Sequence, residues 1–131
     1  MQTVTVTIGR NVPTRHQDAA RLAGLIPLYT GKRAYALNDD AWQAFTDQVI
    51  DQLKFWESQV DGLESTWVET HDGVGVWDGV TEESRKITLL YNAQAEDTAE
   101  DRRDLEQVLR SIRDAYYQDA VSVVWGDSTL I

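Results

Sequence analysis

Two kinds of hydrophobic spacing alternate along this chain, and their order limits the folds that it can adopt. Residues 3–8 alternate Val and Ile with Thr, which is the period of a half-buried strand, and Gly9 ends the run. RKITLLY (85–91) and AVSVVW (120–125) are also typical of strands, the second of them ending at Gly126. Between these strands, apolar residues recur at spacings of three and four and predict two amphipathic helices.

The first helix is predicted over residues 39–56. Asn38 is a favourable N-cap, and two aspartates follow it in the first turn, where they favour the positive end of the helix dipole. Thr98 and Asp101 resemble a capping box at the start of the second helix. The apolar stripes are Trp42, Phe45, Val49, Leu53 and Trp56 in the first helix, and Leu105, Val108, Leu109, Ile112 and Tyr116 in the second.

The stretch STWVETHDGVGVW (65–77) has strand-like pieces at 66–70 and 74–77. Two interpretations fit: a tight hairpin, or one long strand with a bulge at the intervening Gly73. Glycine inside a strand-like pattern favours the bulge. DGVTEES (78–84) then predicts a turn.

The resulting order is β-α-β-β-α-β, in one domain spanning residues 1–131 with a long irregular insert at about 10–38. Right-handed crossovers convert this order into an α+β, ferredoxin-like fold, with one antiparallel sheet and both helices on one face. The other face lacks helices and the chain has five Trp, so we expect a homodimer or larger assembly. Trp67, Trp77 and Trp125 are the candidates for the contact between copies, although each could equally belong to the monomer core.

The segments TVTIGRN, DDAWQAF, GVWDGVTEESRKITLL and AYYQDAV resemble a family of small actinobacterial and phage proteins of unknown function. The resemblance covers residues 3–10 and 38–126 and implies a ferredoxin-like fold. It implies no catalytic residue, because the family is uncharacterised. The insert over residues 12–37 is longer than is typical of that family.

The charge of the chain is unevenly distributed. The formal net charge is −10, yet residues 1–37 carry five basic groups against one acid, and the remaining 94 residues carry 7 against 21. A protein this acidic is repelled by long nucleic acid and by anionic membranes, so we expect neither as a partner. No apolar run reaches the ~20 residues of a membrane span, and no signal peptide is recognised. The predicted location is the cytoplasm, or the host cytoplasm if the protein is encoded by a phage.

The sequence gives little support for a catalytic or cofactor-binding motif. The chain has no Cys and two His, and His71 between carboxylates lacks the further ligands that zinc requires, so no metal and no cofactor are predicted. Ser84 lacks a nucleophile elbow. Gly73, Gly75 and Gly79 do not have the spacing of a dinucleotide-binding loop. Glu82 and Glu83 could act as acid and base in a cleft, but solvated carboxylates are the simpler interpretation.

The basic insert is the strongest candidate site. Cations that converge need an anion among them, which could be the chain's own carboxylates, a neighbouring subunit or a ligand phosphate. Tyr29 and Tyr35, which lie near Lys32 and Arg33 in the sequence, could stack on a base. If a phosphorylated ligand is bound, replacing one arginine with Ala should weaken binding without loss of stability. The predicted ligand-binding residues are Arg10, Arg15, His16, Lys32, Arg33 and Tyr35.

Three functional hypotheses follow. The favoured one is a non-enzymatic homo-oligomeric protein that captures a small phosphorylated ligand such as a nucleotide signal, which in a phage would be a counter-defence sponge. The second is an acidic inhibitor or adaptor of another protein. The third is a dimeric ferredoxin-like enzyme with a pocket between sheet and helices and His71 or Glu69 as its base.

Overall fold

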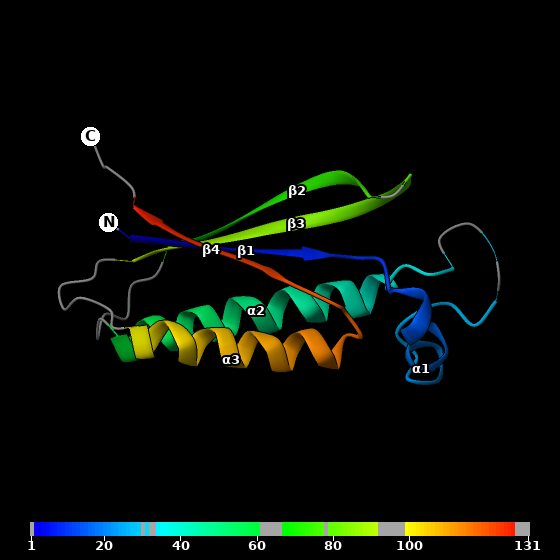
Figure 1. Cartoon of the computed structure of the whole chain (residues 1–131), viewed down its shortest axis with the longest axis horizontal. Coiled ribbons are helices and arrows are strands. Elements are labelled where there is room, and N and C mark those ends of the chain that lie inside the picture. Colours follow the sequence, from blue (N-terminus) through cyan, green and yellow to red (C-terminus); the bar gives the residue numbers. More distant parts are fainter. Residues whose placement is uncertain are drawn as a thin grey trace.

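The protein has an antiparallel sheet with two long helices on one side of it, as the computed structural model in Figure 1 shows. The structure describes residues 2–29, 31, 34–60, 67–77, 79–91 and 99–127. The elements are β1 (Gln2–Gly9), η1 (Thr14–His16), α1 (Gln17–Leu22), α2 (Asp39–Val60), β2 (Trp67–Trp77), β3 (Val80–Tyr91), α3 (Ala99–Ala115) and β4 (Ser122–Asp127).

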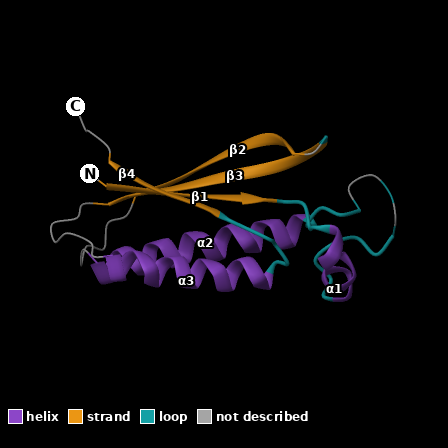
Figure 2. Ribbon diagram, viewed as in Figure 1, coloured by secondary structure: helices purple, strands orange, loops and turns teal. Residues whose placement is uncertain are grey.

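The sheet has the strand order β2-β3-β1-β4, and all neighbouring strands are antiparallel. Both long crossovers, through α2 and through α3, return on the same side of the sheet (Figure 2). This is the ferredoxin-like α+β arrangement, so the predicted fold class is confirmed. No helix among the described residues is long and apolar enough to cross a membrane.

The core lies between the sheet and α2 and α3. Alternate residues of β1 and β3 face the helices and are fully buried, and the predicted stripes of both helices cover them. The ring of Phe45 stacks on that of Tyr116, with centroids 4.7 Å apart, and so joins the two helices. Val108 is the exception in its stripe, because it lies at the edge of the helix contact and is partly exposed.

Helix α2 begins where its sequence predicts. The Asn38 side-chain oxygen accepts a hydrogen bond from the backbone N–H of Ala41 at 2.8 Å, which confirms the N-cap. The helix continues to Val60, four residues beyond the predicted end, because no Gly or Pro interrupts residues 57–60. The predicted cap at Thr98 lies outside the described residues.

Strands β2 and β3 form one long hairpin, and two details of its prediction are wrong. The register runs without interruption from Trp67 opposite Leu90 to Trp77 opposite Val80, so there is no bulge at Gly73. Gly73 instead lies close to Ser84, whose Oγ would be 3.3 Å from an added Cβ. The predicted turn over 78–84 is also wrong, because only residues 78 and 79 separate the strands. Gly79 adopts φ +75°, which permits this short connection.

The insert between β1 and α2 has its two ends side by side. Asn11 bridges Ala36, and backbone hydrogen bonds join Val12 to Tyr35 and Leu37 to Arg10. The short helix α1 lies within the insert, which buries apolar side chains of its own. In Figure 1 this unit lies beyond the end of β1, next to the end of α3.

Candidate functional site

A cavity of about 700 Å³ lies where the insert, the β2–β3 hairpin and the segment after α3 meet. We call it the insert pocket. Its volume is within the range of sites that hold small molecules. The polar side chains that line it include Asn11, Gln17, Tyr35, Glu82, Gln118 and Asp119.

The carboxylate of Glu82 is held against the end of β1. Its Oε2 accepts a hydrogen bond from the backbone N–H of Asn11 at 2.8 Å. An added Cβ on Gly9 would lie only 2.6–2.8 Å from the three atoms of this carboxylate, so the close approach depends on glycine. Glu82 was considered from sequence as one of two paired carboxylates, but its neighbours were not foreseen.

The amide side chains of the pocket use their N–H groups on the backbone. Asn11 donates to the Thr81 carbonyl, Gln17 to that of Val12, and Gln118 to that of Tyr116. Their carbonyl oxygens have no donor among the described residues. Together with the carboxylates, they make the polar part of this wall a set of hydrogen-bond acceptors.

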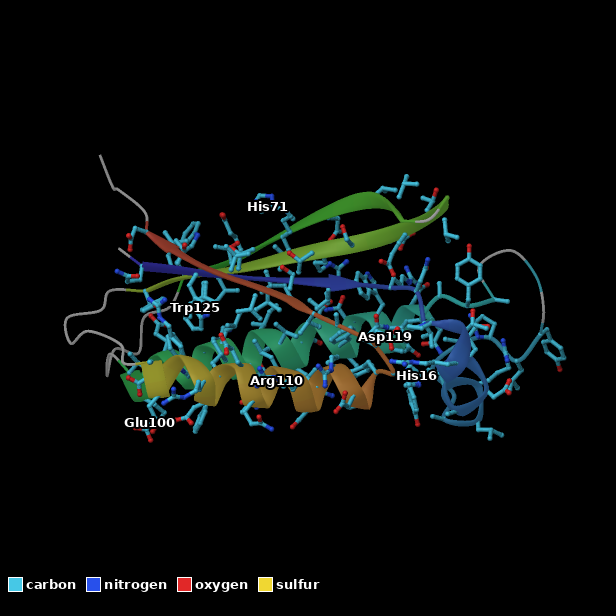
Figure 3. The ribbon with its side chains drawn as sticks, in the orientation of Figure 1. His16, His71, Glu100, Arg110, Asp119 and Trp125 are labelled. Atoms are coloured by element: carbon cyan, nitrogen blue, oxygen red, sulfur yellow. The ribbon has the colours of Figure 1, made fainter. Side chains whose placement is uncertain are left out.

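Arg15 and His16 do not line the insert pocket, but both contact Asp119, which does. The Arg15 guanidinium pairs with the Asp119 carboxylate, and the His16 Nε2 lies 3.3 Å from the same oxygen. Figure 3 shows His16 on the insert and Asp119 after α3 close to each other. Both Arg15 and Asp119 are largely exposed, so their pair contributes little to stability.

Arg10 does not line this pocket. Its Nε donates to the Leu37 carbonyl, and its two terminal nitrogens donate to Glu83 and Asp39, all at 2.7 Å. The side chain is 11% exposed and lies beside the Trp42 ring. Burial alone would lower the pKa of Arg10, but the hydrogen bonds to Asp39 and Glu83 outweigh it and raise the pKa above its usual value.

The other predicted binding residues divide into two groups. Tyr35 lines the insert pocket with its ring partly exposed. Lys32 and Arg33 lie outside the described residues. Of the described candidates, Tyr35 alone lines the insert pocket, Arg15 and His16 contact its lining residue Asp119, and Arg10 belongs to a separate network. The assignment of all six residues to a ligand stays a prediction.

A second charged cluster, which the sequence did not suggest, lies between the hairpin and α2. Arg85 donates to both oxygens of Asp72 and to Thr46 Oγ1, and its guanidinium lies 4.9 Å from the centre of the Trp42 ring. The hydrogen bonds from Arg85 lower the pKa of Asp72 below its usual value. Each polar group in this cluster has a partner in the chain, so the cluster is a structural link between sheet and helix.

The remaining sequence candidates are far from the insert pocket. In Figure 3, His71 projects from β2 on the side of the sheet away from the helices, and its Nε2 is 3.4 Å from Glu69. No metal-binding group of three His, Cys, Asp or Glu occurs within the described ranges. Trp125 packs on Trp56 and donates to Glu106, whereas Trp67 is 62% exposed. The side chain of Trp77 is outside the described set.

Comparison with known proteins gives little beyond the fold. No family model matches the sequence, and no curated protein matches it significantly. Three solved structures resemble the chain. A phage SAM lyase in its apo state has a TM-score of 0.47 at 17% identity, covering 95% of this chain and 78% of that one. The phage SAM lyase in complex with S-methyl-5′-thioadenosine has a TM-score of 0.46 at 17% identity, covering 96% and 80%. The designed protein Foldit4 has a TM-score of 0.37 at 15% identity, covering 98% and 96%.

These likenesses are too distant to inform the activity or the ligands of this chain. Membership of the predicted actinobacterial and phage family likewise stays a prediction.

Proposed function

We propose that the protein binds a small polar ligand of nucleoside size in the insert pocket. The observation that carries this proposal is the pocket itself, an open cavity of about 700 Å³ lined by three segments that are distant in sequence. Tyr35 offers an aromatic ring on which a heterocyclic base can stack. The amides of Gln17 and Gln118 offer carbonyl oxygens for the edge of that base.

The charges that line the pocket favour the nucleoside part of a ligand over a phosphate. Glu82 and Asp119 both contribute carboxylates. A phosphate dianion about 7 Å from the Glu82 carboxylate would be repelled by about 5 kcal/mol at an effective dielectric of 20, before screening by salt. Arg15 already pairs with Asp119.

The narrower hypothesis, capture of a phosphorylated nucleotide by a homo-oligomeric protein, adds a requirement. Arg15 and His16 would have to exchange Asp119 for the phosphate, helped by Lys32 and Arg33. The large exposed fraction of Arg15 makes that exchange sterically possible. A sponge role in a phage would follow only if this narrower form holds.

The proposal can be tested by titrating ¹⁵N-labelled protein with adenosine, AMP and ATP. The side-chain amide signals of Asn11, Gln17 and Gln118 report on the insert pocket, and that of Gln107, exposed on α3, is the matched control. Adenosine is expected to shift the three pocket signals and leave Gln107 unchanged, with AMP and ATP progressively weaker.

The opposite order, with ATP strongest, would support the phosphorylated-ligand hypothesis instead. If none of the three compounds shifts the pocket signals at millimolar concentration, the proposed function is wrong.

A further inference from the structure

Two adjacent glutamates of β3 have different surroundings. Successive side chains of a strand point to opposite faces, so Glu83 points toward the helices and Glu82 points away from them. Glu83 pairs with Arg10 at 2.7 Å. Within the described part of the chain, Glu82 has no Lys, Arg or His nitrogen within 4 Å, and its hydrogen bond comes from the neutral backbone N–H of Asn11. Among the described residues, Glu82 therefore brings to the insert pocket a carboxylate that has no cationic partner.

The position of this carboxylate is fixed by the backbone. The Asn11 N–H holds one oxygen, and the bare Cα of Gly9 lets the whole group lie flat against the end of β1. Glycine is disfavoured in strands because it gives up more chain entropy than other residues. Its presence at Gly9 is explained by this close approach, since Gly9 has no positive φ.

A second observation at the same pocket also indicates a ligand with hydrogen-bond donors. Gln118 is only 7% exposed, and its carbonyl oxygen has no donor among the described residues. A buried acceptor without a donor is costly unless water or a bound molecule supplies one, so Gln118 offers the ligand an acceptor inside the pocket.

We propose that the insert pocket selects a ligand bearing a positively charged amine, and that Glu82, positioned by Gly9, is the residue that recognises this charge. The inference rests on the proposed function and names the ligand class for that site. Asp119 contributes less, because Arg15 neutralises it. His16 also contacts Asp119, whereas Glu82 lines the pocket without such a contact among the described residues, so Glu82 is the anion available to the ligand.

Three probes that share one base test this inference: 5′-amino-5′-deoxyadenosine, which carries a protonated amine, adenosine, and AMP. The wild-type protein is expected to bind the amine about tenfold more tightly than adenosine, and adenosine more tightly than AMP. In Glu82→Gln the preference for the amine should disappear while adenosine affinity changes less than about threefold.

Gly9→Ala tests the positioning. The new Cβ would displace the Glu82 carboxylate, which is the mobile end of a flexible side chain, so the fold should persist while the amine preference falls as in Glu82→Gln. Glu100→Gln is the matched control, because it removes the same charge at the opposite end of α3 (Figure 3) and should keep the wild-type preference.

The outcomes separate the two proposals. If adenosine and the amine bind equally well to the wild-type protein, or if Glu82→Gln retains the tenfold preference, this inference is wrong and the proposed function stands. If neither probe binds, the proposed function fails, and the inference fails with it.

Discussion

Replacing Arg10 with Ala is expected to destabilise the protein strongly, although Arg10 belongs to the part of the chain that looked most like a ligand site. The guanidinium joins three parts of the fold: the end of the insert at Leu37, the first turn of α2 at Asp39, and β3 at Glu83. Its side chain is 11% exposed, so water cannot easily take its place.

The size of the effect follows from the exposure of each partner. The buried Leu37 carbonyl would lose its donor, at a cost of about 1–3 kcal/mol. The Glu83 carboxylate is 41% exposed and would lose about 1 kcal/mol, whereas Asp39 is 97% exposed and would lose close to nothing. The sum is about 3 kcal/mol, or roughly 10 °C in Tm for a domain of this length.

Urea denaturation followed by Trp fluorescence measures this loss, and Arg15→Ala is the matched control. It removes the same side chain and charge from an exposed pair with Asp119, so its stability should stay within about 0.5 kcal/mol of wild type. The reasoning is refuted if Arg10→Ala loses less than about 1 kcal/mol, or if Arg15→Ala loses as much as Arg10→Ala. Either result would mean that the burial of Arg10 and the exposure of Arg15 do not determine how much each side chain contributes to stability.

Three further predictions concern other parts of the molecule. Because Arg85 lowers the pKa of Asp72, the stability from this pair is present above about pH 4 and is lost as pH falls through the lowered pKa; urea denaturation of Asp72→Asn should show a shallower loss of stability in acid. Tyr117→Gly should be more stable than Tyr117→Ala by about 1 kcal/mol, contrary to the usual order, because the residue has φ 56°; equal melting temperatures would contradict this. The expected homo-oligomer should give a light-scattering mass above that of one chain at micromolar concentration, and a monomer mass would disprove it.

Much of the fold was predictable because its signals are local. The alternation of Val and Thr in β1, the Asn38 cap and the two apolar stripes each depend on residues a few positions apart. Such patterns specify an element and its buried face without knowledge of its neighbours. The order of the elements then leaves few topologies, and the ferredoxin-like one is among them.

The hairpin was less predictable because glycine in a strand is compatible with two different local structures. At Gly73, absence of a side chain is compatible with a bulge or with close approach to a neighbour, and only the position of Ser84 decides between them. The Asp-Gly sequence at 78–79 is typical of a two-residue hairpin connection. It indicates the length of the connection between β2 and β3 correctly, whereas the polar residues at 81–84 led to a turn that was predicted too long.

The insert pocket was beyond prediction for a different reason. Its polar lining comes from residues near 11–17, at 35, at 82 and near 118, and nothing in the sequence relates these positions. Tyr35 was the one lining residue predicted to bind a ligand. Glu82 was noticed with Glu83 as a pair, but the alternation that sends them to opposite faces gives them different roles, one in an ion pair and one in the pocket.

The basic segment shows why a local excess of charge is a weak indication of a ligand in an acidic chain. With 22 acidic and 12 basic side chains, carboxylates outnumber the cations that can neutralise them. Arg10 pairs with carboxylates that are 29 and 73 residues away in the sequence, and Arg15 pairs with one that is 104 residues away. Basic and acidic residues that are distant in the sequence therefore form ion pairs in the folded protein. The informative group in such a protein is a fixed carboxylate that no cation reaches. Among the described residues that line the insert pocket, Glu82 is that group, and its charge is what a ligand would have to match.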